Sequence, residues 1–189
     1  MTTLARVRQV LAAHVPRVED APEARPAAVA LVLLEGARGL ELLLIKRAER
    51  QGDPWSGQIA LPGGRRDPSD ADLLATALRE TLEETGVDLA RAERLGTLDD
   101  LYPRTPVLPP VVVRPYVFAL AKRPTLSLSA EVRDAFWVPL AALRAPGVRR
   151  DTVVAVRGVE LIFPAYHHGG HVVWGMTERI LTPFLDMVG

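Results

Sequence analysis

The chain has 189 residues, 48% of them hydrophobic, which is enough to bury one sizeable core but leaves little for a second large domain. Its 23 basic and 23 acidic residues cancel, which argues against a general surface for nucleic acid or for an anionic membrane. The absence of cysteine excludes disulfides and thiol chemistry. We therefore expect a small molecule as the partner, not nucleic acid or a membrane, and the sequence specifies no oligomeric state.

The N-terminal part of the chain is predicted to form a short helix and a connector. Residues 1–26 lack the continuous apolar run of a signal peptide, and no segment approaches the roughly 20 apolar residues that a membrane span needs. We expect a cytoplasmic protein. Residues 2–13 are predicted to form a short helix, and the proline-containing stretch 15–26 is typical of a connector. We assign residues 1–26 to this helix and connector, and residues 27–189 to a single domain.

Apolar runs predict most of the strands. Residues 28–34 and 40–46 are expected to form a hairpin that is buried on both faces. The later predicted elements are a strand at 93–98, a proline-rich loop at 102–110, an apolar run at 111–120, a segment at 136–140 leading into a short helical turn, a hairpin of 152–156 and 159–163, and an amphipathic helix at 174–188. Strands mixed in this way with helices predict an α/β fold in which a mixed sheet lies between helices, an α/β/α sandwich.

A helix with distinct ends is predicted between the first hairpin and residue 86. Ser69 and Asp70 offer N-cap oxygens, Asp72 adds negative charge to the first turn, and Gly86 suits the position after the last turn. One face is apolar and is expected to dock onto the sheet. It comprises Leu74, Ala77, Leu78, Thr81 and Leu82.

The other face of this helix gathers carboxylates. Glu80 lies one helical turn from both Glu83 and Glu84, so three acids meet on one side of the axis. Such crowding repels itself unless a cation lies there. Arg79 precedes Glu83 by four residues and can pair with it. The alternative interpretation is a solvated helix with one Glu–Arg pair, the usual meaning of a charge run.

The loop before the helix decides between these interpretations. Gly63 and Gly64 allow a close backbone turn, because glycine adopts positive φ without penalty. Gly-Gly, then an acid, then Arg-Glu-x-x-Glu-Glu-x-Gly resembles the signature of the Nudix hydrolase superfamily. Asp70 stands where that signature has its first Glu, and eight residues instead of seven separate it from Arg79. Thr81 replaces an aliphatic residue. The matching positions are Gly64, Arg79, Glu80, Glu83, Glu84, Gly86 and Val87.

The resemblance implies a hydrolase of phosphoanhydrides that depends on Mg²⁺ or Mn²⁺. Divalent ions neutralise phosphate oxygens and lower the pKa of the attacking water, and these hard ions prefer carboxylate and carbonyl oxygen. The metal ligands implied here are the Gly64 carbonyl and the side chains of Glu80, Glu83 and Glu84. Catalytic roles fall on Arg79, Glu83, Glu84 and Glu131.

Glu131 enters through a second, weaker resemblance. The segment from Glu131 to Trp137 is similar to a loop of many Nudix enzymes whose Glu faces the metals as a ligand or general base. The alternative is an exposed loop acid that carries only surface charge. The general base is equally well Glu83 or Glu84, because a carboxylate can act as a base only if it escapes full ligation by the cations.

The similarity narrows toward the coenzyme A pyrophosphatases of this superfamily. Residues 43–48, 57–64 and 174–177 carry text like that of this branch, whereas the spacer 49–56 is one residue longer and lacks the expected Met-Arg or Leu-Arg pair. We expect cleavage of coenzyme A or a derivative at its pyrophosphate. The alternatives are another nucleotide, such as ADP-ribose, NADH, a dinucleoside polyphosphate or an oxidised dNTP, and a nucleotide sensor without turnover. Retention of the self-repelling acids argues against the sensor.

Other side chains are weaker candidates for the site. Arg47 and Arg65 are expected to bind substrate phosphates, since arginine recognises phosphate in bidentate fashion, although ordinary surface charge is the alternative for each. Trp55 can stack on a base, or it can anchor a turn on the core. The histidines at 167, 168 and 171 flank two glycines, which favours a hairpin turn over a metal site.

Overall fold

The centre of the fold is a hairpin of two long apolar strands. The computed structural model describes residues 2–52, 55–104, 109–156 and 158–189. Strand β1 (Arg25–Gly36) pairs with β2 (Gly39–Arg47), and the turn between them is closed where Gly36 lies opposite Gly39. The predicted hairpin is confirmed, and both strands extend beyond the predicted ends.

Seven strands form the main sheet around this hairpin. Strand β1 runs parallel to β6 (Val111–Leu120) and antiparallel to β2, so the sheet is mixed. The backbone order is β3-β2-β1-β6-β5, with β4 added beside β1 and β7 beside β2. The bounds of the added strands are β3 (Ile59–Ala60), β4 (Gly63–Arg65), β5 (Glu93–Thr97) and β7 (Val132–Pro139).

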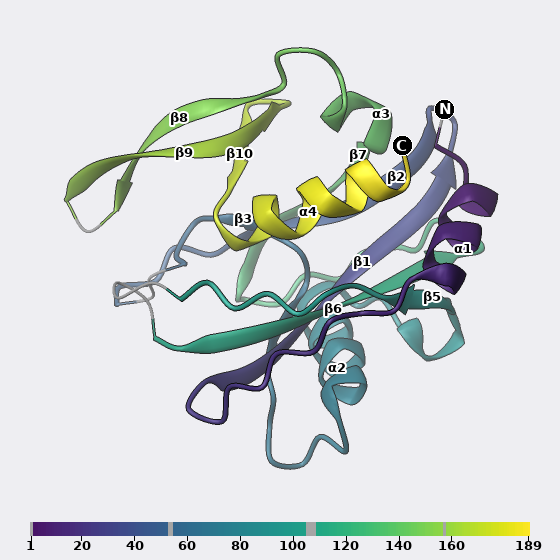
Figure 1. Ribbon diagram of the computed structural model, residues 1–189, viewed down its shortest axis with the longest axis horizontal. Coiled ribbons are helices and arrows are strands. Elements are labelled where there is room, and N and C mark those ends of the chain that lie inside the picture. Colours follow the sequence, from purple (N-terminus) through teal and green to yellow (C-terminus); the bar gives the residue numbers. More distant parts are fainter. Residues whose placement is uncertain (1, 53–54, 105–108, 157) are drawn as a thin grey trace.

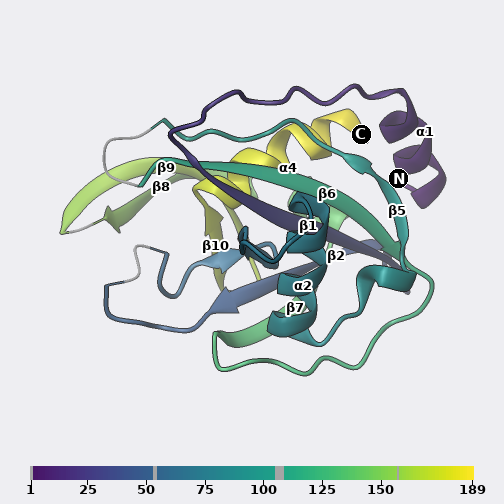
Figure 2. The ribbon, with the colours of Figure 1, turned by 90° about the horizontal axis from the view of Figure 1, so that it is seen from below.

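Helices cover both faces of this sheet (Figures 1 and 2). Helix α2 (Leu73–Thr85) lies on one face, and α4 (Met176–Met187) with α1 (Leu4–Ala13) lies on the other. Side chains alternate along β1: Leu31 and Leu33 join the core under α1 and α4, whereas Ala30 and Val32 join the core under α2. Because successive side chains point to opposite faces of the sheet, the strand contributes to both cores. The predicted α/β/α sandwich is confirmed.

The N-terminal helix is packed into the main core. Val7 and Leu11 are buried in the same cluster as residues of α4. Two short helical turns, η1 (Leu89–Arg91) and α3 (Leu140–Leu143), complete the helical elements. Within the described ranges, no helix is long and apolar enough to cross a membrane. The predicted loop at 102–110 lies partly outside the described residues.

A second, three-stranded sheet follows α3. Its strands are β8 (Arg149–Val156), β9 (Val159–His168) and β10 (His171–Trp174). The β8–β9 hairpin extends away from the body, at the upper left of Figure 1. The glycines at 169 and 170 form the turn to β10, which confirms the predicted hairpin turn at the histidines. Trp174 belongs to β10, so the C-terminal helix begins two residues later than predicted.

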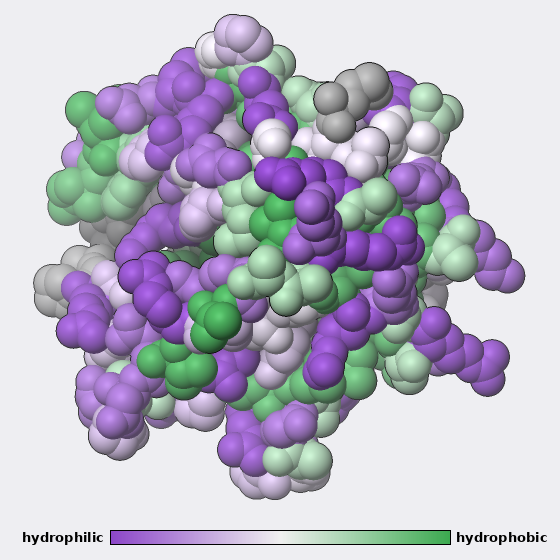
Figure 3. Space-filling view, turned by 45° about the vertical axis from the view of Figure 1, so that its right-hand side comes forward, coloured by the Kyte–Doolittle hydropathy of each residue, from purple (hydrophilic) through white to green (hydrophobic). Residues whose placement is uncertain are grey.

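The surface of the molecule is mostly hydrophilic on the side that Figure 3 shows. On the side shown in Figure 3, hydrophilic residues cover most of the molecule, and apolar residues form smaller groups between them. That side therefore presents no single broad apolar face.

Candidate active site

The start of α2 differs from the sequence prediction. Asp72, not Ser69 or Asp70, is the N-cap, and its side chain accepts a hydrogen bond from the backbone N–H of Ala75. The prediction that Ser69 and Asp70 cap the helix is therefore wrong. The physical reason is the partner that Asp70 finds elsewhere: a bidentate ion pair with Arg79, which is stronger than an ordinary capping bond.

Asp70 is a buried anchor for the Arg79 side chain. Its two carboxylate oxygens accept hydrogen bonds of 2.9 Å from Nε and Nη2 of Arg79, and it also accepts bonds from Asp67 and Thr76. The Arg79 guanidinium, with these further donors, holds the pKa of the Asp70 carboxyl well below its usual range. In return, the bond to Asp70 raises the pKa of Arg79.

Arg79 also donates hydrogen bonds to two acids of α2, Glu80 and Glu83. Its Nη1 donates to Glu80 at 2.9 Å and to Glu83 at 3.1 Å. The Glu83 side chain is 58% exposed, whereas Glu80 is largely buried, and burial raises the pKa of Glu80 despite the arginine. One arginine thus fixes both carboxylates, on the side of α2 that faces β4.

Two glycines let α2 approach the sheet this closely. Gly63 and Gly64 pair with Val29 and Ala28 of β1. A Cβ built on Gly64 would lie 2.5 Å from Cδ of Glu80, and one on Gly63 would lie 2.3 Å from the carbonyl oxygen of Ala28. Gly63 also has a φ of 147°, which side chains rarely permit. Gly64 is therefore required by the packing of Glu80, and Gly63 by the close approach of β4 to β1.

Glu84 is the most buried acid of the site. Only 3% of it is exposed, and it accepts a 2.9 Å hydrogen bond from the backbone N–H of Gly63. Nη1 of Arg47 lies 3.9 Å from its other oxygen. Burial, together with repulsion from Glu80 and Glu131, raises the pKa of Glu84 to about 7, and the Gly63 bond and Arg47 only partly oppose this.

Glu131 reaches the same place from the segment that precedes β7. It lies just before β7, where its carbonyl oxygen accepts a 2.8 Å bond from the backbone of Ala48. Its carboxylate accepts a 3.0 Å hydrogen bond from Nη1 of Arg50. The connection between Ala48 and Glu131 holds the end of β2 and the loop before β7 together.

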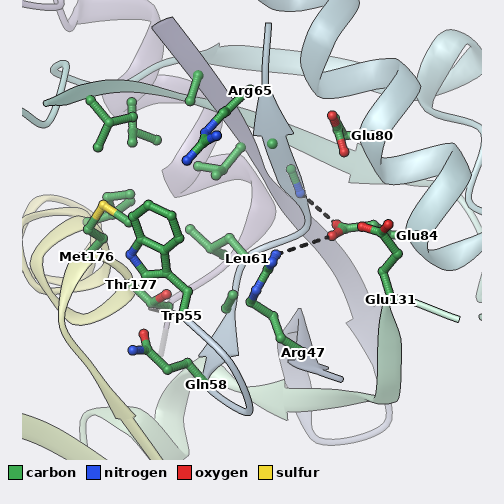
Figure 4. Close-up of a pocket in the computed structure, with 18 of the residues that line it drawn as sticks. Arg47, Trp55, Gln58, Leu61, Arg65, Glu80, Glu84, Glu131, Met176 and Thr177 are labelled. Carbon is green, nitrogen blue, oxygen red and sulfur yellow. Dashed lines mark hydrogen bonds and ion pairs between the residues drawn. The ribbon is translucent and has the colours of Figure 1, made fainter. Parts of the chain in front are cut away.

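These side chains line one pocket of about 430 Å³ (Figure 4). The carboxylates of Glu84 and Glu131 lie on one side of it, and Trp55, Met176 and Thr177 lie on the other. Its lining consists of Ala27, Val29, Arg47, Arg50, Trp55, Gln58, Ala60, Leu61, Gly63, Gly64, Arg65, Glu80, Glu84, Val111, Val113, Glu131, Met176, Thr177 and Ile180. The pocket is therefore charged at one end and mainly apolar at the other, with a size typical of ligand sites.

Six of the eight predicted site residues line this pocket, and two do not. Gly64, Glu80, Glu84, Glu131, Arg47 and Arg65 belong to the lining. Arg79 and Glu83 lie outside it, where Arg79 acts through Glu80. Arg65 also stacks over the ring of Trp55, with its guanidinium carbon 5.7 Å from the centroid.

The sequence interpretation missed part of the lining. Ile180 and the valines of β6 were predicted only as residues of a helix and of an apolar run. The one available signal was the segment 174–177, whose Thr177 donates a hydrogen bond to the carbonyl of Ile59. This bond joins the first turn of α4 to the strand that leads into the Gly-Gly loop.

The donors fit a hard divalent cation in their chemistry. All are oxygens, the carboxylate of Glu84 is buried close to the partly buried one of Glu80, and Gly64 leaves space for Glu80 where any side chain would intrude. Within the described ranges, however, no group of three His, Asp or Glu side chains converges so as to hold a metal ion. The reason is visible in the ion pairs: arginines engage Glu80, Glu83, Glu84 and Glu131.

Comparison with known proteins agrees with this geometry. The family model of the NUDIX domain matches residues 24–156. The mitochondrial coenzyme A diphosphatase NUDT8 of Mus musculus is 34% identical over 178 residues, which cover 93% of this chain and 82% of the relative. The protein of the same name from Homo sapiens is 35% identical, with 95% and 75% of the two chains covered.

Solved structures show the same fold. A MutT/nudix family protein from Enterococcus faecalis aligns with a TM-score of 0.57 and 23% identity over 95% of this chain and 67% of its own. The NUDIX domain of Shewanella oneidensis NrtR, complexed with ADP ribose, aligns with a TM-score of 0.52 and 28% identity over 73% of this chain and 86% of its own. Members of this family generally use divalent metal ions. The chain belongs to the Nudix family, and the protein is a Nudix pyrophosphohydrolase.

Proposed function

We propose that the enzyme cleaves the pyrophosphate of coenzyme A or a coenzyme A derivative with Mg²⁺ or Mn²⁺. The products are a phosphoadenosine compound and a phosphopantetheine-like one. The observation that carries this proposal is the meeting of three distant segments in one pocket: Arg47, the Gly57–Gly64 stretch and the first turn of α4. These are the segments whose sequence resembles the coenzyme A pyrophosphatases, and the relatives named coenzyme A diphosphatase support the same substrate.

Different residues of the pocket bind the diphosphate, hold the cation and accept the proton. Arg47, Arg50 and Arg65 bind the diphosphate, because guanidinium groups match phosphate oxygens. The carbonyl of Gly64 with Glu80 and Glu84 would hold the divalent cation, and Glu83, which lies outside the pocket lining, would add negative charge from the next position of α2. When bound, such a cation neutralises phosphate charge and lowers the pKa of water. Glu131 takes the proton from the attacking water, since it is half-exposed and lies near Glu84.

The apolar end of the pocket supports a substrate with an uncharged arm. Trp55 and Met176 lie across the pocket from the carboxylates of Glu84 and Glu131, so phosphates bound near the carboxylates would leave this apolar part for a neutral group. A pantetheine arm or a nucleobase has the required chemistry.

ADP-ribose is the second candidate substrate. It is favoured by one observation, the likeness to the NUDIX domain of Shewanella oneidensis NrtR that was solved with ADP ribose. This ligand also has a diphosphate joined to uncharged groups. Unlike coenzyme A, ADP-ribose lacks the 3′-phosphate and the pantetheine arm. A comparison of the rates for the two substrates therefore separates the two proposals.

Steady-state kinetics on purified enzyme with Mg²⁺ separates the two candidates. The panel contains coenzyme A, dephospho-coenzyme A, ADP-ribose, NADH, a diadenosine polyphosphate and a dNTP. We expect kcat/KM for coenzyme A to exceed that for ADP-ribose by at least roughly tenfold, a difference of about 1.4 kcal/mol in transition-state binding. Equal or faster hydrolysis of ADP-ribose would exclude the coenzyme A assignment.

A further inference from the structure

Two ion pairs, each between an arginine and a glutamate, line the pocket. Nη1 of Arg47 lies 3.9 Å from Glu84, and Nη1 of Arg50 lies 3.0 Å from Glu131. The arginines come from the end of β2 and the residues just after it, and the glutamates come from α2 and the loop before β7. All four side chains line the same cavity (Figure 4 labels three of them).

In each pair the charge of the arginine compensates the charge of the glutamate, so both groups are occupied before any ligand binds. Arg47 and Arg50 are the groups suited to a diphosphate, and Glu84 and Glu131 are those suited to a cation. A diphosphate that binds alone must draw the arginines from their partners and leave Glu84 and Glu131 to repel one another. A cation that binds alone must leave the arginines facing a further positive charge. Either ligand by itself therefore loses part of its attraction.

A cation and a diphosphate that bind together face no such penalty. The carboxylates turn to the cation, the guanidinium groups turn to the phosphates, and every charge keeps a partner of opposite sign. Coupling of this kind is reciprocal: each ligand must strengthen the binding of the other by the same factor.

We propose that the pocket admits a divalent cation and a diphosphate as a unit, by exchange of ion-pair partners, and that Arg47 and Arg50 weaken the binding of the cation alone. This inference rests on the proposed function only in requiring a diphosphate ligand and a divalent cation. It does not depend on coenzyme A.

Binding measurements without turnover test the exchange. The probes are Mn²⁺, followed by the electron paramagnetic resonance signal of the free ion, and α,β-methylene-ADP in EDTA, followed by calorimetry. The main variant is Arg50→Gln, whose exposed ion pair contributes little to folding. We expect it to bind Mn²⁺ roughly three- to fivefold more tightly than wild type, the factor that corresponds to an exposed pair of ordinary strength, and to bind α,β-methylene-ADP more weakly. Glu131→Gln should shift both affinities the opposite way.

The chain offers a closely matched control. Arg8 and Glu93 form an ion pair of 2.8 Å with side-chain exposures of 47% and 48%, against 49% and 53% for Arg50 and Glu131, and they lie outside the pocket. Arg8→Gln should leave both affinities unchanged. Unchanged or weaker Mn²⁺ binding in Arg50→Gln would overturn the inference, and so would an absence of Mn²⁺ binding in every variant. Because no coenzyme A is used, a wrong substrate assignment would leave the expected result intact.

Discussion

Replacement of Asp70 by asparagine tests the structural role that the sequence did not predict. The side chain keeps its size but loses its charge, so the ion pair with Arg79 is broken while the packing is retained. Asp70→Asn leaves the Arg79 guanidinium with only Glu80 and Glu83 as acidic partners. We therefore expect loss of stability together with looser positioning of Glu80.

The magnitude follows from the bonds that are lost. Four hydrogen bonds of 2.8–2.9 Å reach the Asp70 carboxylate, two of them from Arg79. Three of these bonds end on Oδ2 and one, from Nε of Arg79, ends on Oδ1. An amide that keeps its oxygen at Oδ2 loses the bond from Nε and the charge of the pair, and charge-assisted bonds contribute roughly 1.5–3 kcal/mol each. Arg79 is 28% exposed and retains other partners, which reduces the penalty. A decrease of about 2–3 kcal/mol in the free energy of unfolding is expected.

Urea unfolding followed by tryptophan fluorescence measures this change, because the chain contains three tryptophans. Glu83→Gln is the control, since it removes an exposed partner of the same arginine and should cost no more than about 0.5 kcal/mol. A loss below about 0.5 kcal/mol in Asp70→Asn, or an equal loss in both variants, would refute the reasoning.

Further predictions concern acid stability, the acids of the site and the metal. The folded-state pKa of Asp70 is lowered, so the ionised carboxylate stabilises the fold fully above the ordinary aspartate pKa of about 4, and this contribution is lost as pH falls below that value. The free energy of unfolding of Asp70→Asn should therefore fall less between pH 7 and pH 3 than that of wild type. Glu84→Gln should lose on the order of 10²-fold or more in kcat with an unchanged circular dichroism spectrum, and wild-type turnover would contradict its role. Gly64→Ala should displace Glu80, lower kcat and destabilise the fold by about 1–3 kcal/mol, whereas an unaffected variant would show that the close approach is not required. EDTA should abolish hydrolysis and added Mg²⁺ or Mn²⁺ should restore it; full activity in the chelator would exclude the metal-dependent mechanism.

The long elements were predictable because their signals are local. The apolar runs of β1, β2 and β6 are buried on both faces, and such runs have few alternatives to a central strand. Strands β4 and β10 were not predicted. They have three and four residues, and they exist only because Gly64 meets Ala28 and His171 meets His168. Pairing with a neighbouring strand determines these two short strands, and their own residues show no pattern that would predict it.

The buried face of α2 also differs from the predicted stripe. Leu82, which the stripe included, is 48% exposed, whereas Thr76, which it did not include, is fully buried. Hydroxyl groups inside the protein are tolerated where they find acceptors, as Thr76 does at Asp70. Hydrophobicity alone therefore placed the stripe partly on the wrong residues, because it does not register a threonine that packs its methyl group and bonds its hydroxyl.

The site was predictable as a set of residues but not as an arrangement. The helix motif and the loop motif named Glu80, Glu84 and Glu131, and the structure brings these three to one pocket. The partners of the acids depend on distant chain segments: Arg50 lies 81 positions from Glu131. A spacing rule along one helix contains no information about such contacts.

Identification of the products of coenzyme A hydrolysis by mass spectrometry tests the central claim most directly. The enzyme is incubated with coenzyme A and Mg²⁺, with parallel reactions in EDTA and with Glu84→Gln. Cleavage at the pyrophosphate predicts one phosphoadenosine product and one phosphopantetheine product in equal amounts, formed by wild type with metal and nearly absent from both controls. Intact coenzyme A after prolonged incubation, in a preparation that hydrolyses ADP-ribose under the same conditions, would contradict the assignment.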